Sequence, residues 1–115
     1  MNKPCKIYYY ITASGENPFD SFLDSLSEKQ QRKILRILTA IGVYGLASAI
    51  PHIKKLTGTS LWEIRILGQD NIRVLYATLV GDSIIVLHGF SKKSPKTPVK
   101  EIKTARDRLK DWLDK

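Results

Sequence analysis

The chain has 115 residues, of which 43% are hydrophobic, and this is enough apolar material for the core of one domain. Its formal net charge of +8 favours nucleic acid, an acidic protein or an anionic membrane surface as a partner. The single cysteine, Cys5, excludes an intramolecular disulfide and a multi-cysteine zinc site, and the two scattered histidines match no metal motif. We therefore expect one domain over residues 1–115 that uses no metal and no cofactor.

The sequence gives no sign of export or of a membrane span. No apolar run approaches the ~20 residues that a helix needs to cross a bilayer. The segment from Cys5 to Ile11 is strand-like and rich in tyrosine, and no small-residue cleavage site follows it. We therefore expect a cytoplasmic protein without a membrane partner.

The first half of the chain predicts one strand followed by two helices. Residues 6–11 are rich in β-branched and aromatic side chains, as strands are. Pro18 suits the first position of a helix, and Ser27 with Gln30 forms a capping-box pattern that starts a second one. Gly42 and Gly45 both suit the end of that helix. We expect the two helices to form a hairpin that folds over a sheet.

The second half predicts three strands and a final helix. The predicted strands are residues 61–67, 72–79 and 84–90. Residues 46–60 form the connection before them, with room for a short helical turn near Ile53. A basic loop follows, and Thr97-Pro98 is expected to cap the final helix. The layout β-α-α-β-β-β-α predicts a compact α+β domain with a twisted, mainly antiparallel sheet.

Arg65 and Arg73 are the polar residues that say most about chemistry. Successive side chains on a strand point to opposite faces, so Arg65 shares a face with Glu63 and not with Trp62. Arg73 comes from the neighbouring strand and is expected on the same face. We therefore expect a sheet with an apolar back and a solvated, cationic front that carries both arginines. Two guanidinium groups there could hold a phosphate and stabilise charge that develops on it. The alternative is a solvated sheet face on which Arg65 pairs with Glu63 or Asp82.

Five lysines stand near these arginines in the expected fold. Lys92, Lys93 and Lys96 lie close together in the loop after the last predicted strand. Lys54 and Lys55 lie before the predicted strand at residues 61–67. Alone, such a charge run is usually a solvated loop. Beside two arginines, it favours a rim that binds phosphate groups.

His88 is the remaining candidate for chemistry, on an apolar strand. It is either a satisfied core or edge histidine or a general acid or base, because its ordinary pKa lies near neutrality. The chain has no Gly-rich phosphate loop and no Ser/His/Asp arrangement. Any catalysis would therefore depend mainly on arginine and lysine.

Four segments, taken in their order and spacing, form a specific pattern over nearly the whole chain. They are residues 55–65 (Lys-Leu-Thr-Gly to Leu-Trp-Glu-Ile-Arg), 73–76 (Arg-Val-Leu-Tyr), 90–93 (Phe-Ser-Lys-Lys) and 96–108, from Lys-Thr-Pro to Arg108. In this pattern the chain resembles toxins of the RelE/ParE superfamily, and most of all the phage-derived HigB-like branch of type II toxin–antitoxin systems. The resemblance implies a RelE-like fold and a metal-independent endoribonuclease that cuts mRNA on the ribosome and so inhibits translation.

The resemblance also implies partners and site residues. The partners would be the ribosome with its mRNA and a cognate helix-turn-helix antitoxin, HigA-like, through which the toxin would be linked to DNA only indirectly. Basic residues of the strands and of the following loop act on RNA in such toxins. The catalytic candidates are therefore Arg65, Arg73 and Lys93. The RNA-binding candidates are Lys54, Lys55, Lys92 and Lys96. Arg32 and Arg36 on the second helix are candidates for contact with the antitoxin.

Two departures from the family pattern leave alternatives open. Glu63 stands where many relatives place a further basic residue, and the tyrosine often found near the start of the final helix is absent. His88 and Tyr76 are then the candidates for activating the ribose 2′-hydroxyl. The rival function is that of a ParE-like, non-enzymatic gyrase inhibitor, which shares the scaffold but lacks the basic set. A third interpretation is an inactive, phage-derived RNA-binding module.

Overall fold

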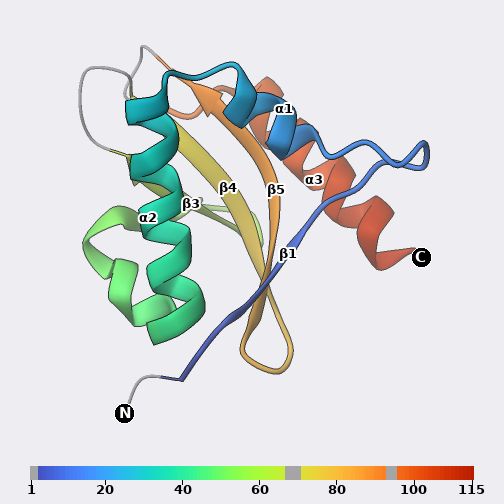
Figure 1. Ribbon diagram of the computed structural model, residues 1–115. Helices are drawn as coiled ribbons and strands as arrows, with labels where there is room; N and C mark the ends of the chain where they lie inside the picture. The colour runs from blue at the N-terminus through green and yellow to red at the C-terminus, as the bar shows by residue number, and fades with distance from the viewer. Residues whose placement is uncertain (1–2, 67–70, 93–95) are drawn as a thin grey trace.

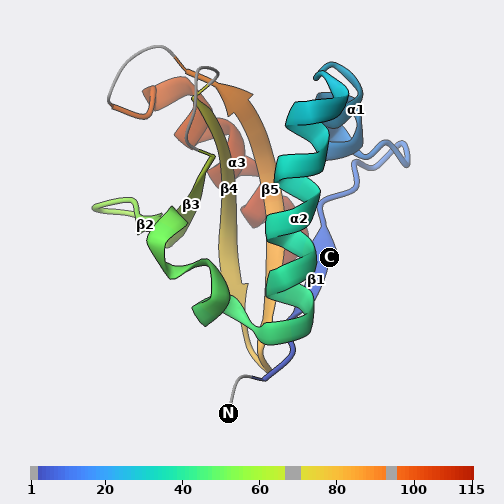
Figure 2. The same cartoon turned by 60° about the vertical axis from the view of Figure 1, so that its left-hand side comes forward.

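A five-stranded sheet runs through the parts of the chain that the computed structural model describes, residues 3–66, 71–92 and 96–115 (Figures 1 and 2). The strands lie in the order β1-β5-β4-β3-β2, and every neighbouring pair is antiparallel except β1 with β5. Their bounds are β1 (Lys6–Tyr9), β2 (Ile53–Lys55), β3 (Leu61–Ile66), β4 (Ile72–Leu79) and β5 (Ser83–Ser91). The predicted α+β class with a mainly antiparallel sheet is confirmed.

Helices cover both faces of this sheet, with α2 on one side and α3 on the other in both views (Figures 1 and 2). The helices are α1 (Pro18–Asp24), α2 (Glu28–Tyr44), the 3-10 helix η1 (Leu46–His52) and α3 (Val99–Leu113). In the described ranges, none of these helices has the length and apolarity that a bilayer span requires. The expected helical hairpin and C-terminal helix are both present.

The caps of α2 follow the local chemistry that the sequence predicts. The Ser27 hydroxyl accepts a hydrogen bond from the Gln30 backbone, and the Gln30 side chain accepts one from the Ser27 backbone. Gly45 ends the helix with a φ of +89°, a backbone conformation that L side chains rarely adopt. A Cβ at Gly45 would also collide with the carbonyl oxygen of Lys3. This end of α2 therefore requires glycine.

The sheet is apolar on both faces, which corrects the expectation of one apolar and one cationic face. Ile64, Val74 and Tyr76 pack in the core that includes α1 and α2 residues. Leu61 and Leu75 point the other way, into a second core that Ala105 of α3 completes. The second face is apolar over most of its length because α3 covers it. The arginines stand at the end of that face where β3 stops and β4 begins.

A β-bulge in β5 determines where His88 points, and alternation along the strand alone would not predict it. Tyr76 is opposite Val86, yet Leu75 is opposite His88, so Leu87 is the extra residue. Leu87 and Phe90 therefore both belong to the core under α3, although their sequence positions differ in parity. The bulge brings His88 to the face on which the arginines lie.

Candidate functional site

Arg65 on β3 and Arg73 on β4 stand directly opposite each other in the antiparallel register. Directly opposite residues project to the same face, so the predicted shared face is confirmed. Arg65 is half-buried, whereas Arg73 is only 5% exposed. Two like charges in this arrangement repel, and burial makes the repulsion stronger unless a counter-charge is present.

Glu63 supplies that counter-charge and is itself only 3% exposed. Its Oε1 lies 3.7 Å from Nε of Arg73, and its Oε2 accepts a 2.7 Å hydrogen bond from the Thr97 hydroxyl. A terminal nitrogen of Arg73 donates to the carbonyl of Ile72 at 3.1 Å, while its Nε has no hydrogen-bond partner in the described structure. Burial lowers the pKa of Arg73, and Glu63 acts against that effect. Arg73 is therefore a buried member of a charged cluster, which corrects its expected place on a solvated face.

Thr97 also departs from its predicted role. The sequence predicts Thr97-Pro98 as the cap of the last helix, but the N-cap residue is Pro98, and among the described residues no side chain caps that end. The Thr97 hydroxyl instead donates to Glu63. This bond joins the segment that enters α3 to the middle of β3.

Lys92 and Lys54 complete a group that we call the cationic cluster, defined as Lys54, Arg65, Arg73 and Lys92. Lys92 is 5% exposed, and its backbone N–H donates to the carbonyl of Asn71 at 3.1 Å. The pKa of Lys92 is lowered first by burial and also by the other three cations, whereas Glu63 raises it. Lys54 on β2 stands directly opposite Glu63 on β3, so the two side chains lie on the same face of the sheet. Four cations thus surround one carboxylate.

The other predicted lysines do not join this cluster in the same way. Lys55 stands opposite Trp62, so it lies on the other face, with its Nζ 5.8 Å from the centre of the Trp62 ring. Lys96 is exposed on the segment before α3. Lys93, the predicted catalytic lysine, lies outside the described residues. The predicted RNA-binding set is therefore divided between two faces.

Tyr76 lies on the face opposite the arginines, which argues against its candidate role as acid or base. It is 1% exposed in the core that includes α2 residues. Burial raises its pKa to about 12. A phenol so placed neither reaches a substrate at Arg65 nor releases its proton near neutrality.

His88 is engaged at both ring nitrogens by residues of α3. Its Nε2 lies 3.0 Å from Oε1 of Glu101, and its Nδ1 lies 3.2 Å from a guanidinium nitrogen of Arg108. The same guanidinium nitrogen donates to the carbonyl of Leu87 at 2.9 Å. Because arginine only donates, Nδ1 accepts and Nε2–H donates to Glu101. The geometry favours a satisfied histidine that fastens α3 to β5.

Arg32 and Arg36 are exposed on α2, across the sheet from the cationic cluster. Arg32 forms a 3.7 Å ion pair with Glu28, one turn earlier. Arg36 borders a hollow of about 240 Å³ that Lys33, Ile37, His52 and Ile66 also line. The two candidate surfaces, for RNA and for antitoxin, therefore lie on different sides of the molecule.

Comparison with known families gives one decisive match. The model of the family described as phage derived protein Gp49-like (DUF891) matches residues 21–110. The chain belongs to this Gp49-like family. The family is one of RelE-type, toxin-like proteins, and the observed fold is consistent with a RelE-like domain. No curated protein matches the chain.

The matched range of this Gp49-like protein contains the whole cationic cluster and its counter-charge. It also contains three residues whose roles the sequence did not reveal, Thr97, Glu101 and Arg108. Glu101 and Arg108 are seven residues apart, which places them on one face of a helix. That spacing could have predicted that both side chains contact one polar partner. The partner, His88, could not be predicted because its position depends on the bulge in β5.

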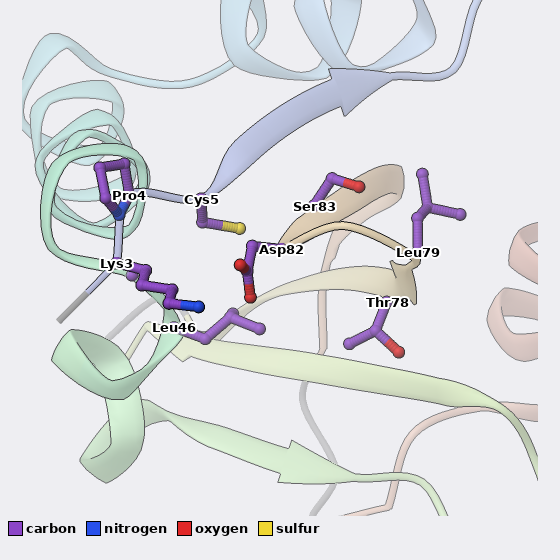
Figure 3. A pocket seen from close by; sticks show the side chains of 9 residues that line it. Lys3, Pro4, Cys5, Leu46, Thr78, Leu79, Asp82 and Ser83 are labelled. Atoms are coloured by element: carbon purple, nitrogen blue, oxygen red, sulfur yellow. The ribbon is translucent and has the colours of Figure 1, made fainter.

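A pocket of about 220 Å³ in the Gp49-like protein lies at the end of the sheet opposite the cationic cluster, where β4 ends and β5 begins (Figure 3). The N-terminal segment, the end of α2 and the β4–β5 hairpin form it, with Cys5 and Asp82 among its lining residues. Burial and the nearby Asp82 carboxylate both raise the pKa of the Cys5 thiol. A raised pKa disfavours the thiolate, so Cys5 is not activated as a nucleophile.

Proposed function

We propose that this Gp49-like protein is the toxin of a type II toxin–antitoxin system, of the HigB-like kind, and that it cuts mRNA on the ribosome. The observation that carries the proposal is the cationic cluster at one end of the sheet. Lys54, Arg65, Arg73 and Lys92 present four positive charges around the single negative charge of Glu63. The excess positive charge favours a polyanion, and RNA is the polyanion that the family resemblance suggests.

The proposed reaction is attack of a ribose 2′-hydroxyl on the adjacent phosphorus. A bond from O2′ to phosphorus forms and the bond from phosphorus to O5′ breaks, which gives a 2′,3′-cyclic phosphate and a 5′-hydroxyl. The proton that leaves the 2′-hydroxyl is balanced by one that the O5′ leaving group gains. The half-buried Arg65 would contact the phosphate, and the buried Arg73 and Lys92 beside it would stabilise the negative charge that develops. The proposed mechanism is metal-independent.

The contacts of the acid and base candidates support a dependence on the ribosome. His88 is occupied at both nitrogens, and Tyr76 is buried on the other face. We therefore propose that the ribosome orients the 2′-hydroxyl and assists the proton transfers. Orientation of a reacting group can supply a large part of a rate enhancement.

Primer extension on translated and untranslated copies of one transcript tests this function. We expect induction of the protein to arrest growth and to produce cuts in the translated copy alone. Arg65→Ala should remove the cuts, whereas Arg106→Ala, an equal change at an exposed site on α3, should retain them. Equal cutting of both transcripts would contradict ribosome dependence.

The second candidate function is gyrase inhibition without catalysis, as in ParE-like toxins. The burial of Arg73 and Lys92 favours it, because a cluster that is mostly buried resembles a structural one. A supercoiling assay separates the two candidates. Inhibited supercoiling with uncut messages would favour gyrase.

A further inference from the structure

Glu63 is a buried carboxylate at the centre of a site that we propose for RNA, where its negative charge opposes the substrate. It is 3% exposed, and in the sheet it lies directly between Lys54 of β2 and Leu75 of β4. Burial of a carboxylate is costly unless charges and hydrogen bonds compensate it. Its contacts therefore indicate what it does there.

Its two oxygens contact two different elements. Oε1 lies 3.7 Å from Nε of Arg73 on β4, and Oε2 accepts the 2.7 Å hydrogen bond from Thr97. Thr97 is two residues before the first residue of α3. One carboxylate thus joins the arginine of β4 to the segment that connects β5 with α3.

This geometry argues against Glu63 as the general base. A general base must come within hydrogen-bond reach of the hydroxyl that it deprotonates. Glu63 has almost no exposed surface, and its oxygens are directed at Arg73 and Thr97. Glu63 can therefore influence the reaction only through the groups that it holds.

We propose that Glu63 is a positioning residue of the RNA-cleaving site, which fixes Arg73 and the Thr97 segment relative to each other and supplies the negative charge beside which the cations of the cluster are packed. The inference rests on the proposed function and deepens it. Glu63 is the internal counter-charge that allows Arg73 and Lys92 to be buried together. The site is thereby preorganised before RNA arrives.

The charges around Lys92 show the electrostatic part of this role. Lys92 faces Glu63 and Arg65 of β3, Arg73 of β4 and Lys54 of β2, while Glu101 of α3 is engaged by His88. Burial and the three neighbouring cations lower the pKa of Lys92, and Glu63 raises it. Removal of the Glu63 charge should therefore lower the pKa of Lys92 further.

Two variants separate the charge of Glu63 from its hydrogen bond. Glu63→Gln keeps the size and an acceptor for Thr97 but removes the charge, with Glu16→Gln at an exposed site as its matched control. Thr97→Val removes the donated hydrogen bond and keeps the charge, with Thr97→Ser as the conservative rescue. Steady-state cleavage of ribosome-bound mRNA gives kcat and KM, and an NMR titration of the Lys92 ammonium gives its pKa without any reaction.

We expect Glu63→Gln and Thr97→Val to lower kcat by roughly 10-fold to 100-fold, as small displacements of catalytic groups do, with little change in KM. Glu16→Gln and Thr97→Ser should cleave as the wild type does, and Lys92 should lose its proton at lower pH in Glu63→Gln. If Glu63→Gln does not fold, Thr97→Val and Thr97→Ser decide the matter alone. Unchanged kcat in Thr97→Val, or an unchanged Lys92 titration in a folded Glu63→Gln, would overturn the inference. A wild-type protein that leaves mRNA uncut contradicts the proposed function instead, and the Lys92 titration then still tests Glu63.

Discussion

Arg65 and Arg73 differ in their surroundings although they face each other across two strands. Arg73 is 5% exposed and depends on Glu63, whereas Arg65 is half-buried. Truncation of one partner of a buried ion pair leaves an uncompensated charge, which is strongly destabilising. The two arginines should therefore behave differently when each is removed.

We predict that Arg73→Ala lowers the free energy of unfolding by about 3 kcal/mol, because it removes the buried cation that lies 3.7 Å from the buried Glu63 carboxylate. Arg65→Ala should change it by only about 0.5 kcal/mol, as partly exposed positions usually do. Urea denaturation of both variants beside the wild type measures the difference. Equal losses of stability in the two variants would contradict the claim that Arg73 is part of a buried ion pair and Arg65 is not.

His88 is a second residue for which a structural role and a catalytic role can be told apart. Because both its nitrogens are occupied by α3, we expect His88→Gln to lower the midpoint of thermal unfolding and to retain cleavage of ribosome-bound mRNA. A general acid or base typically contributes 10²-fold to 10⁴-fold to a rate. A loss of that size in a folded His88→Gln protein would return His88 to the catalytic set.

At the scale of elements, the C-terminal half of α3 is held by polar contacts to β5 and to the segment that follows β1. Arg108 donates to the carbonyl of Leu87 and to His88, and near the C-terminus Asp111 accepts a 2.6 Å hydrogen bond from the Tyr10 hydroxyl. That hydrogen bond lowers the pKa of Asp111 and raises the pKa of Tyr10. These contacts join the end of the chain to a segment next to β1.

The Tyr10–Asp111 contact predicts a dependence of stability on pH. A carboxyl whose pKa is depressed in the folded state stabilises the fold above its unfolded pKa, which is about 3.9 for Asp. That stabilisation is lost as the pH falls through the folded pKa. Tyr10→Phe should therefore melt below the wild type at neutral pH, and the gap should narrow in acid. Thermal melts of both proteins over this range check the sign, and a gap that widens in acid would show that Asp111 is not the group responsible.

The same scale shows how far the sequence determines the fold. The capping box at Ser27, the glycine end of α2 and the alternation of β3 and β4 are local patterns, so each was predictable from neighbouring residues. The bulge at Leu87 and the burial of Arg73 depend on contacts between distant segments. The shared face of Arg65 and Arg73 was therefore predictable, while the counter-charge role of Glu63 and the engagement of His88 by α3 were not.

At the scale of the whole molecule, the sheet separates two surfaces. The cationic cluster lies on the face that α3 covers, and Arg32 and Arg36 lie on α2 across the sheet. An antitoxin on α2 would leave the cluster itself uncovered and would inhibit by adding bulk that the ribosome cannot accommodate. An antitoxin over the cluster would compete with RNA directly.

We propose the first arrangement, and we predict that Arg32→Glu with Arg36→Glu weakens antitoxin affinity and reduces its dependence on salt, because exposed charges act mainly through screened attraction. Arg106→Glu with Lys110→Glu, an equal reversal of two exposed charges on α3, should change both quantities less. Antitoxin affinity of the wild type and of both variants, measured at several salt concentrations, shows whether α2 or α3 contributes more to binding. The same affinity and salt dependence as the wild type in the α2 variant would exclude α2 as the docking surface.

The most direct test of the account is the rate at which the purified protein cuts an mRNA bound to the ribosome, measured beside the same mRNA free in solution. The account predicts cuts on the ribosome that end in a 2′,3′-cyclic phosphate and little cutting of the free RNA. It also predicts a loss of roughly a hundredfold or more for Arg65→Ala, the size expected when one preorganised charge stabiliser is removed. Cleavage by Arg65→Ala at the wild-type rate, or an intact message on the ribosome, would contradict the central claim.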